Sequence, residues 1–291
     1  MLIRLYDFTD FRINDDIVFS YIYILSKNSR LTLKVNNYNT DINIIGSIPD
    51  YHLIYKALPM LLNNQSELEN MLVSNNEFDF RTEKSRKRFL SALNSALVNE
   101  NNGINEFVGN LINYFKNDEN SQSVLLFWLF SINNKLFYEL NRDVFLKYYF
   151  QGRAELPKES IIAYIKDLIS RNEELKGKWS EITIETIASK YLTILKKLNL
   201  VEGNQKKKFK LNRITDEQLT IFINLINNLK DIKINLLEEE LMSFSFISNE
   251  NLLDRLKRIG KKDWIKLNYN GATLQVEPVF NNNNIIDGIY R

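Results

Sequence analysis

Apolar residues between positions 180 and 213 form one helical stripe followed by two short alternating runs. The stripe recurs every three or four residues, as on one face of a helix, at Ile184, Ile187, Ala188, Tyr191, Leu192, Leu195 and Leu198. It predicts a helix over 184–198, with Thr183 as an N-cap whose hydroxyl accepts an amide hydrogen of the first turn. A strand at 200–202, a turn at Gly203–Asn204 and a return strand at 206–211 follow. A helix that leads into such a hairpin is typical of a winged helix.

Further stripes at the same spacing occupy most of the remaining chain. They predict helices over 15–26, 49–62, 66–74, 82–97, 104–115, 121–131, 135–150, 160–170, 215–229 and 249–259. Alternating runs predict a second hairpin, in which 263–269 pairs with 272–278 across Asn270–Gly271, and a third that joins 31–35 to 41–45. The predicted fold class is mainly α, a helical bundle with winged-helix-like units and short β-hairpins.

A break at Gly152–Pro157 separates the bundle stripes from the winged-helix stripes. On that basis we divide the chain into four parts. An N-terminal extension of mixed α/β structure covers 1–60, and a helical bundle covers 61–152. A winged-helix-like module covers 153–230, and a helix-plus-hairpin module covers 231–291.

Positive charge is concentrated in the predicted winged helix. Residues 179–213 hold eight Lys or Arg against three Glu, a net of +5, whereas the whole chain is +2 and the remainder is therefore −3. Short hydroxyls and lysines suit phosphates and base edges of duplex DNA. The candidate DNA-binding residues are Thr186, Ser189, Lys190, Thr193 and Lys197 on the helix and Lys206, Lys207, Lys208 and Lys210 on the hairpin. The alternative is a protein-contact module with a solvated hairpin.

A second group of cations lies at the start of the helix predicted over 82–97, with Thr82 as its N-cap. Its candidate phosphate-binding members are Arg81, Lys84, Arg86 and Arg88, next to Lys87. The helix dipole favours anions at this end, so the placement indicates a phosphate or an acidic partner. The alternative is a solvated helix end offset by Glu83. The C-terminal module is basic as well, at Arg255, Lys257, Arg258, Lys261, Lys262 and Lys266.

Aromatic side chains are dense between positions 127 and 150. They are Phe127, Trp128, Phe130, Phe137, Phe145, Tyr148, Tyr149 and Phe150. We interpret them as the core of the bundle rather than as a platform on which nucleobases stack.

Motifs of catalysis, metal binding and membrane insertion are missing from the sequence. The chain has no cysteine and a single histidine, His52, so we expect no metal site, no cofactor and no Ser/His triad. It has no glycine-rich phosphate loop. The longest apolar run, 124–130, is far shorter than the roughly 20 residues of a membrane helix, and no signal peptide opens the chain. These features predict a soluble cytoplasmic protein that is not an enzyme.

Four segments, in this order, resemble the BrxA family of bacterial BREX phage-exclusion systems. They are FDFRTEKSRKRFLSAL, LLFWLFSINNKLFYELNRDVFLKYYFQG, KWSEITIETIASKYLTILKKLNLVEG and LLDRLKRIGKKDWIKLNYNGATLQVEP. The resemblance spans roughly 60–280 and leaves the first 55 or so residues as an extension.

The resemblance implies a small, mostly helical, non-enzymatic DNA-binding component with a NusB-like bundle. It also implies partners in the defence system, namely a methyltransferase, an ATPase and a phosphatase-like protein. Two alternatives stay open at this point, a scaffold that contacts those partners and an RNA-binding NusB-like protein.

Overall fold

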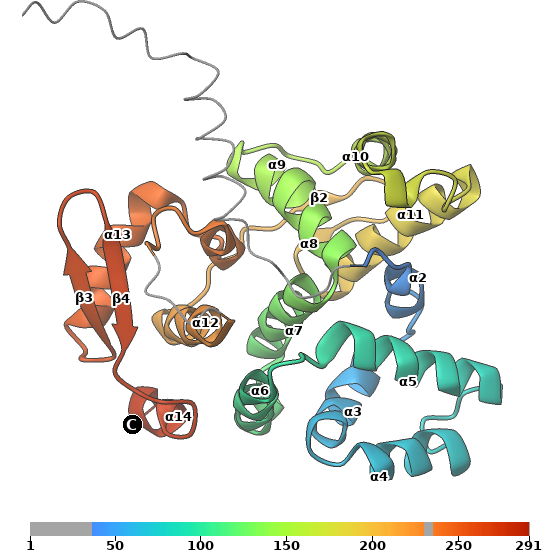
Figure 1. Ribbon diagram of the computed structural model, residues 1–291, viewed down its shortest axis with the longest axis horizontal. Helices are drawn as coiled ribbons and strands as arrows, with labels where there is room; N and C mark the ends of the chain where they lie inside the picture. Colours follow the sequence, from blue (N-terminus) through green and yellow to red (C-terminus); the bar gives the residue numbers. More distant parts are fainter. Residues whose placement is uncertain (1–36, 230–234, 291) are drawn as a thin grey trace, which may run out of the picture. The chain divides into compact units, whose positions relative to one another are not determined.

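The structure is a computed structural model that describes residues 37–229 and 235–290 (Figure 1). This part of the chain is mainly helical and includes two antiparallel strand pairs, as the sequence predicts. The helix predicted over 15–26 and the strand predicted at 31–35 lie outside the described residues.

The first half of the described chain is entirely helical. Its elements are α2 (Asp41–Ile45), α3 (His52–Asn63), α4 (Gln65–Glu69), the π-turn η1 (Asn70–Ser74), α5 (Glu83–Leu97), α6 (Asn102–Tyr114), the 3-10 turn η2 (Phe115–Asn117), α7 (Glu119–Asn133), α8 (Lys135–Leu140), the π-turn η3 (Asn141–Leu146) and α9 (Lys147–Phe150). The helix predicted over 135–150 is thus one run of helix with a π-turn in its middle. Thr82 caps α5 as predicted, because its hydroxyl oxygen accepts from the amide of Ser85 at 3.1 Å.

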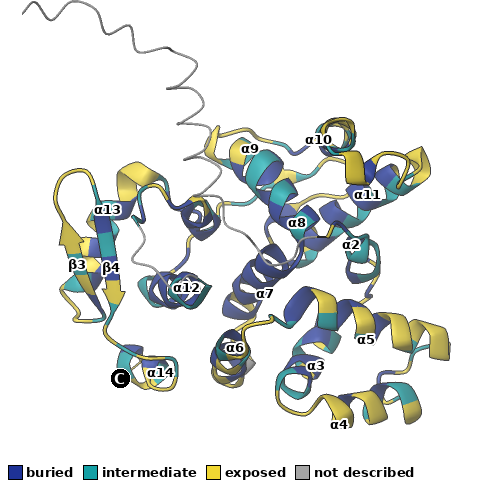
Figure 2. Ribbon diagram, viewed as in Figure 1, coloured by how far each residue is buried: buried dark blue, intermediate teal, exposed yellow. Residues whose placement is uncertain are grey.

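Helix α7 forms the centre of the bundle. Every residue from Val124 to Asn133 is buried, which Figure 2 shows as an almost uniformly dark helix. A helix that is apolar on all sides must be enclosed by others, and α7 contacts both α5 and α8. The aromatic residues Phe127, Trp128 and Phe130 are fully buried here, so this part of the core interpretation is confirmed.

The second half alternates helices with the two hairpins. Its elements are α10 (Lys158–Arg171), the 3-10 turn η4 (Glu173–Leu175), α11 (Glu181–Lys197), β1 (Val201–Glu202), β2 (Lys208–Phe209), α12 (Asp216–Leu229), the 3-10 turn η5 (Glu240–Ser245), α13 (Asn249–Gly260), β3 (Ile265–Tyr269), β4 (Leu274–Pro278) and α14 (Ile285–Ile289). The first hairpin is shorter than predicted, whereas the second pairs five residues on each strand.

One predicted strand is a helix. Residues 41–45 form α2, although the run of isoleucines favours a strand by composition. Ile42 and Ile45 are both buried. Residues three apart share one side of a helix but point to opposite faces of a strand. Only a helix therefore buries both, and α2 packs against α5 and α11 with them.

A third short strand segment completes the first hairpin. Glu155 forms an antiparallel bridge with Lys208. The Leu156 amide donates to the Lys207 carbonyl at 2.8 Å, and the Phe209 amide donates to the Ala154 carbonyl at 3.1 Å. The chain therefore runs from the α8–α9 helix through a strand segment, two helices and a hairpin. Phe209 stacks on Phe145 of η3 with ring centroids 5.4 Å apart, which fixes the hairpin to the bundle.

Candidate nucleic-acid interface

Helix α11 is held to the bundle by a buried chain of hydrogen bonds. Tyr191 is fully buried, and its hydroxyl donates to Oδ1 of Asn141 at 2.7 Å. The Asn141 amide nitrogen donates to Oγ of Ser131 at 2.9 Å, and that hydroxyl donates to the Phe127 carbonyl at 2.6 Å. Burial raises the pKa of Tyr191 well above its ordinary value, so the phenol stays protonated. Each polar group has a partner, as a buried network requires.

The start of α11 differs from the prediction by one turn. Ser180 is the N-cap, and its hydroxyl oxygen accepts from the amide of Thr183 at 3.3 Å. Thr183 lies inside the helix, so its predicted role as N-cap is wrong. The sequence offers two hydroxyl residues three positions apart, and both satisfy the preference for a small hydroxyl side chain.

The outward hydroxyls of α11 are turned to the helix backbone. Each donates to the carbonyl four residues earlier: Thr186 to Ile182 at 2.7 Å, Ser189 to Glu185 at 2.9 Å and Thr193 to Ser189 at 2.9 Å. This back-bonding is common for hydroxyl residues within helices. Their oxygen atoms retain acceptor capacity, but they have no free hydrogen to offer a phosphate or a base acceptor.

Helix α2 covers one flank of α11. A side chain at Gly46, the C-cap of α2, would lie 2.7 Å from the Lys190 carbonyl oxygen and 2.8 Å from its Cβ, so the two backbones meet closely. The Lys197 ammonium donates to the Ile48 carbonyl and lies 5.2 Å from the centre of the Tyr51 ring. Burial and the nearby charge of Lys190 lower the pKa of Lys197. Lys197 thus faces protein, and Lys190 lies at the edge of α2.

Helix α10 covers the opposite flank through two ion pairs. Lys166 meets Glu181 at 2.6 Å, and Lys158 meets Glu185 at 3.6 Å. Between the two flanking helices, α11 exposes a narrow stripe. It consists of the exposed residues Ile182, which is 79% exposed, and Lys196, with the half-buried residues Thr186, Ser189 and Thr193 between them.

The predicted basic tip of the hairpin is partly folded onto itself. Lys207 donates to the Gly203 carbonyl at 3.0 Å, and Lys196 of α11 donates to Oδ1 of Asn204 at 2.7 Å. Burial and the charge of Lys196 lower the pKa of Lys207. Gly203 has φ +94°, and a Cβ there would lie 2.1 Å from the Lys206 carbonyl, so this turn requires glycine.

The remaining hairpin lysines differ in how firmly they are held. Lys210 donates to the side chain of Asn199, and Lys206 lies at the 4.0 Å limit of an ion pair with Glu155. Lys208 is exposed, and no hydrogen bond or ion pair of its ammonium occurs in the part of the chain that the structure describes. Lys206 and Lys208 are therefore the hairpin cations most free to meet an anion.

The cations of α5 form a separate patch. Arg81, Lys84 and Arg88 are exposed, while Lys87 pairs with Glu83 at 2.6 Å. The contact between α5 and residues 39–41 is made through Ser95. Ser95 lies nine positions beyond Arg86, about 14 Å along the helix axis. The structure therefore does not bring this patch together with the face of α11.

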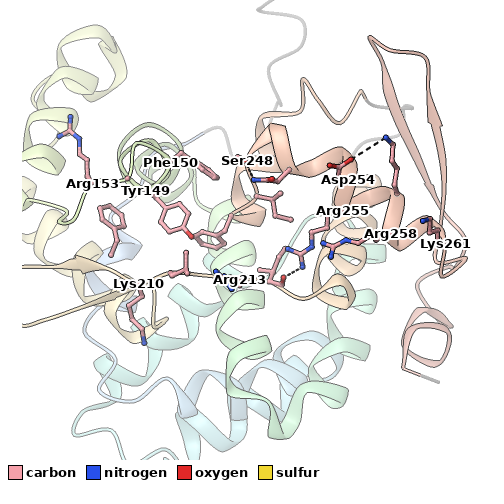
Figure 3. A pocket seen from close by; sticks show the side chains of 18 residues that line it. Tyr149, Phe150, Arg153, Lys210, Arg213, Ser248, Asp254, Arg255, Arg258 and Lys261 are labelled. Atoms are coloured by element: carbon pink, nitrogen blue, oxygen red, sulfur yellow. Dashed lines mark hydrogen bonds and ion pairs between the residues drawn. The ribbon is translucent and has the colours of Figure 1, made fainter.

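A basic recess that the sequence does not indicate lies between the first hairpin and α13. It has a volume of about 1020 Å³, and seven of its eighteen lining residues are Lys or Arg while one, Asp254, is a carboxylate (Figure 3). In Figure 3, Arg153 and Tyr149 lie on one side, Arg258 and Lys261 on the other, and Arg213 between them. The recess has an aromatic part, to which Tyr149, Phe150 and Phe209 contribute.

One cation of the basic recess is structural. Arg255 donates to Oδ1 of Asp216 at 3.0 Å and to the Ile214 carbonyl, which joins α13 to the start of α12. Lys262 reaches the same carboxylate at 3.3 Å. Burial opposes ionisation of Asp216, but the hydrogen bonds from Arg255 and Lys262 outweigh it and lower the pKa of this carboxyl.

Two further classes of site, metal centres and membrane-spanning helices, are absent from the described residues. No group of three or more His, Cys, Asp or Glu side chains there is arranged to hold a metal ion. Within 37–229 and 235–290, none of the helices combines the length and apolar character of a membrane crossing.

Comparison with known proteins identifies one family. The BrxA family matches residues 52–224, more than half of the chain and including α3 through α11, the first hairpin and most of α12. No curated protein and no solved structure matches the chain. The match covers the bundle, the anchored helix α11 and the basic hairpin in one continuous segment. The chain therefore belongs to the BrxA family, whose members are components of BREX-type phage defence.

Proposed function

We propose that this protein is the duplex-DNA-binding, non-enzymatic component of its BREX system and that it acts in the cytoplasm with other proteins of that system. The observation that carries the proposal is the exposed hairpin, with Lys206 and Lys208 beside the open stripe of α11. A hairpin adjoining a helix with an open face is the arrangement in which winged helices meet a duplex. When cations without firm protein partners neutralise phosphates, counterions that were condensed on the DNA are released, and that release drives binding.

The proposed contact is mainly to the DNA backbone. The hydroxyls of Thr186, Ser189 and Thr193 have no free hydrogen, so they can accept from amino groups of bases but cannot donate to phosphates. Lys197 is held by the α2 segment, so its role in the proposal is structural. Lys190 lies at the edge of α2, so it can contact a DNA phosphate only if α2 leaves room for the duplex. The consequence is low sequence specificity, because phosphates position a protein without reading the sequence.

The α5 patch supports a second contact of a different kind. It is separated from α11 along the α5 axis, and Arg81, Lys84 and Arg88 are exposed. We propose that it meets an acidic surface of another protein of the defence system, with the methyltransferase, the ATPase and the phosphatase-like protein as candidates. Exchange of Arg86 and Arg88 for Glu should then leave duplex affinity unchanged at low salt. A uniform loss of affinity for all duplexes would instead make the patch a second phosphate contact.

The test of the main proposal is a titration of the full chain with fluorescent duplex DNA at several salt concentrations. Each phosphate contact contributes about −0.9 to the slope of log affinity against log salt. The proposal predicts a slope of about −2 or steeper and similar affinity for unrelated duplexes of one length. A slope near zero would overturn it and leave the scaffold as the function. Tighter binding to duplex RNA than to duplex DNA would favour the RNA-binding alternative.

A further inference from the structure

We propose that the basic recess between the first hairpin and α13 binds a segment of single-stranded nucleic acid. This site is separate from the exposed hairpin tip and does not depend on the duplex contact proposed above. Its walls come from three places in the chain, the end of α9 with the following loop, the segment after β2, and α13. Seven cations against one carboxylate make it suited to a polyanion.

Three of these cations are available to a ligand. Within the residues that the structure describes, Arg213, Arg258 and Lys261 make no ion pair and no side-chain hydrogen bond. All three side chains are exposed, and they come from two parts of the chain, the segment after β2 for Arg213 and α13 with its C-cap for Arg258 and Lys261. Leaving three like charges together without partners costs free energy in the absence of an anion. A chain of phosphates passing between the walls would satisfy all three.

The position of Arg213 is fixed by the aromatic part of the recess. The Tyr149 hydroxyl donates to the Asn212 carbonyl at 3.2 Å, and the Asn212 amide donates back to the same oxygen at 3.2 Å. Tyr149 in turn packs edge-on against Phe246, with ring centroids 5.4 Å apart. Asn212, the residue before Arg213, is therefore bonded to the bundle, so the backbone that carries the Arg213 side chain is held in place.

Apolar surface lies open beside the cations. Phe150 is 41% exposed and Leu211 is 73% exposed, although both are large apolar residues. Phe150 packs edge-on against Tyr149, with ring centroids 5.4 Å apart, so one edge of its ring is supported by protein. Aromatic faces beside a positively charged groove are the features on which the bases of single strands stack. Asn251, whose amide donates to Oγ of Ser248 at 2.9 Å, adds a polar group for base edges.

Single strands fit these features better than a duplex does. In a duplex the faces of the bases are stacked on one another, so the exposed ring of Phe150 would find no base face to stack on. A recess of about 1020 Å³ holds a few nucleotides but is far too small to admit a double helix. DNA and RNA share the phosphates and base faces that this recess recognises, so the test must separate them.

The test measures anisotropy of full-length protein with labelled dT15, the RNA U15 and a 15-bp duplex at two or more salt concentrations. The groove variant is Arg213→Ala/Arg258→Ala, and the stacking variant is Phe150→Ala. The matched control is Lys56→Ala/Lys176→Ala, which removes two exposed cations outside the recess, the first hairpin and the α5 patch. Because Arg213 and Arg258 make no ion pair or side-chain hydrogen bond with the described residues, their removal should leave thermal unfolding unchanged, which is checked alongside.

The groove variant should bind dT15 or U15 at least tenfold more weakly, with the salt slope reduced by about 0.7 for each lost phosphate contact. Duplex affinity should change less than threefold, and the control variant should match the unmutated protein. Phe150→Ala should weaken single-strand binding severalfold with an unchanged salt slope. Preference for dT15 or for U15 identifies the natural strand.

Three results would overturn the inference. If the unmutated protein fails to bind either single strand at low salt, the recess is not a nucleic-acid site. If the groove variant retains single-strand affinity, binding occurs elsewhere and an acidic protein becomes the better occupant. If it loses duplex and single-strand affinity equally, the recess belongs to the duplex contact. If only the duplex proposal is wrong, duplex binding should show a salt slope near zero while the protein still binds dT15 or U15.

Discussion

Helices α11 and α13 make an instructive pair, because each is amphipathic, basic and followed by a β-hairpin. In α11 the lysines are largely engaged: Lys197 binds the α2 segment and Lys196 supports the hairpin turn. In α13, Arg255 bonds to Asp216 and Lys257 pairs with the exposed Asp254 at 3.9 Å, while Arg258 makes no ion pair or side-chain hydrogen bond within the described residues. The helix with the stronger sequence signal for DNA binding thus has the less accessible charge. The number of cations in a segment does not tell which of them a ligand can reach.

The two helices are also attached in different ways. α11 is fixed by the buried hydrogen bonds of Tyr191 and Asn141. α13 is joined to α12 by the partly exposed ion pair between Arg255 and Asp216, in addition to buried leucines. A buried network is costly to interrupt, whereas an ion pair near the surface contributes little. The comparison therefore predicts unequal costs for removing the two attachments.

The largest effect is expected for Tyr191→Phe. It leaves Oδ1 of Asn141 buried without its donor, so the free energy of unfolding should fall by about 1–3 kcal/mol in urea denaturation. The same change at Tyr269, whose hydroxyl bonds to the exposed Gly271 carbonyl, is the control. It should cost about 0.5 kcal/mol or less. Equal costs at the two tyrosines would show that the buried network does not hold α11.

Gly46→Ala should have the next largest effect. The new Cβ would meet the Lys190 backbone, so α2 must move away from α11 at a cost of about 1–2 kcal/mol. Amides of 40–48 should then exchange faster with solvent, and duplex affinity should rise because the flank of α11 opens. Ser47→Ala, at an exposed neighbouring position, is the control. Faster exchange without a gain in affinity would mean that α2 does not limit access to α11.

Asp216→Asn should have the smallest effect, about 1 kcal/mol of stability at pH 7. Because the pKa of Asp216 is lowered in the folded protein, its contribution is present above the unfolded pKa of about 4 and is lost as the pH falls below it. Urea denaturation at pH 7 and at pH 3 should therefore show the two proteins converging in acid. If the two proteins differ in free energy of unfolding by the same amount at pH 7 and at pH 3, the ion pair does not attach α13 to α12.

Periodicity predicted most of the fold correctly. The apolar stripes predicted the helices of residues 52–260 within a few positions, and Asn270–Gly271 located the second hairpin. Its register differs from the prediction, because Tyr269 pairs with Leu274 rather than with residue 272. Residues 41–45 were predicted wrongly because β-branched composition favours a strand, whereas burial of Ile42 and Ile45 on one side selects a helix. Tertiary packing decided between the two, which composition alone does not encode.

The candidate site could be predicted only in part. The basic hairpin follows from local charge, but the engagement of Lys197 depends on a segment about 150 positions away. The basic recess was missed because its walls lie at 149–153, 209–214 and 246–261. From the sequence, Tyr149 and Phe150 were interpreted as core residues. The density of aromatic residues along the chain does not distinguish Phe145, which is buried, from Phe150, which is exposed.

The central claim is that accessible cations, rather than all basic residues, make the contact with duplex DNA. Its most direct test compares the salt slopes of duplex binding for Lys208→Ala and Lys190→Ala, two single-charge changes on the hairpin and on α11. The slope should flatten by about 0.9 for Lys208→Ala, which loses one phosphate contact, and should stay unchanged for Lys190→Ala. A flattened slope for Lys190→Ala with none for Lys208→Ala would contradict it.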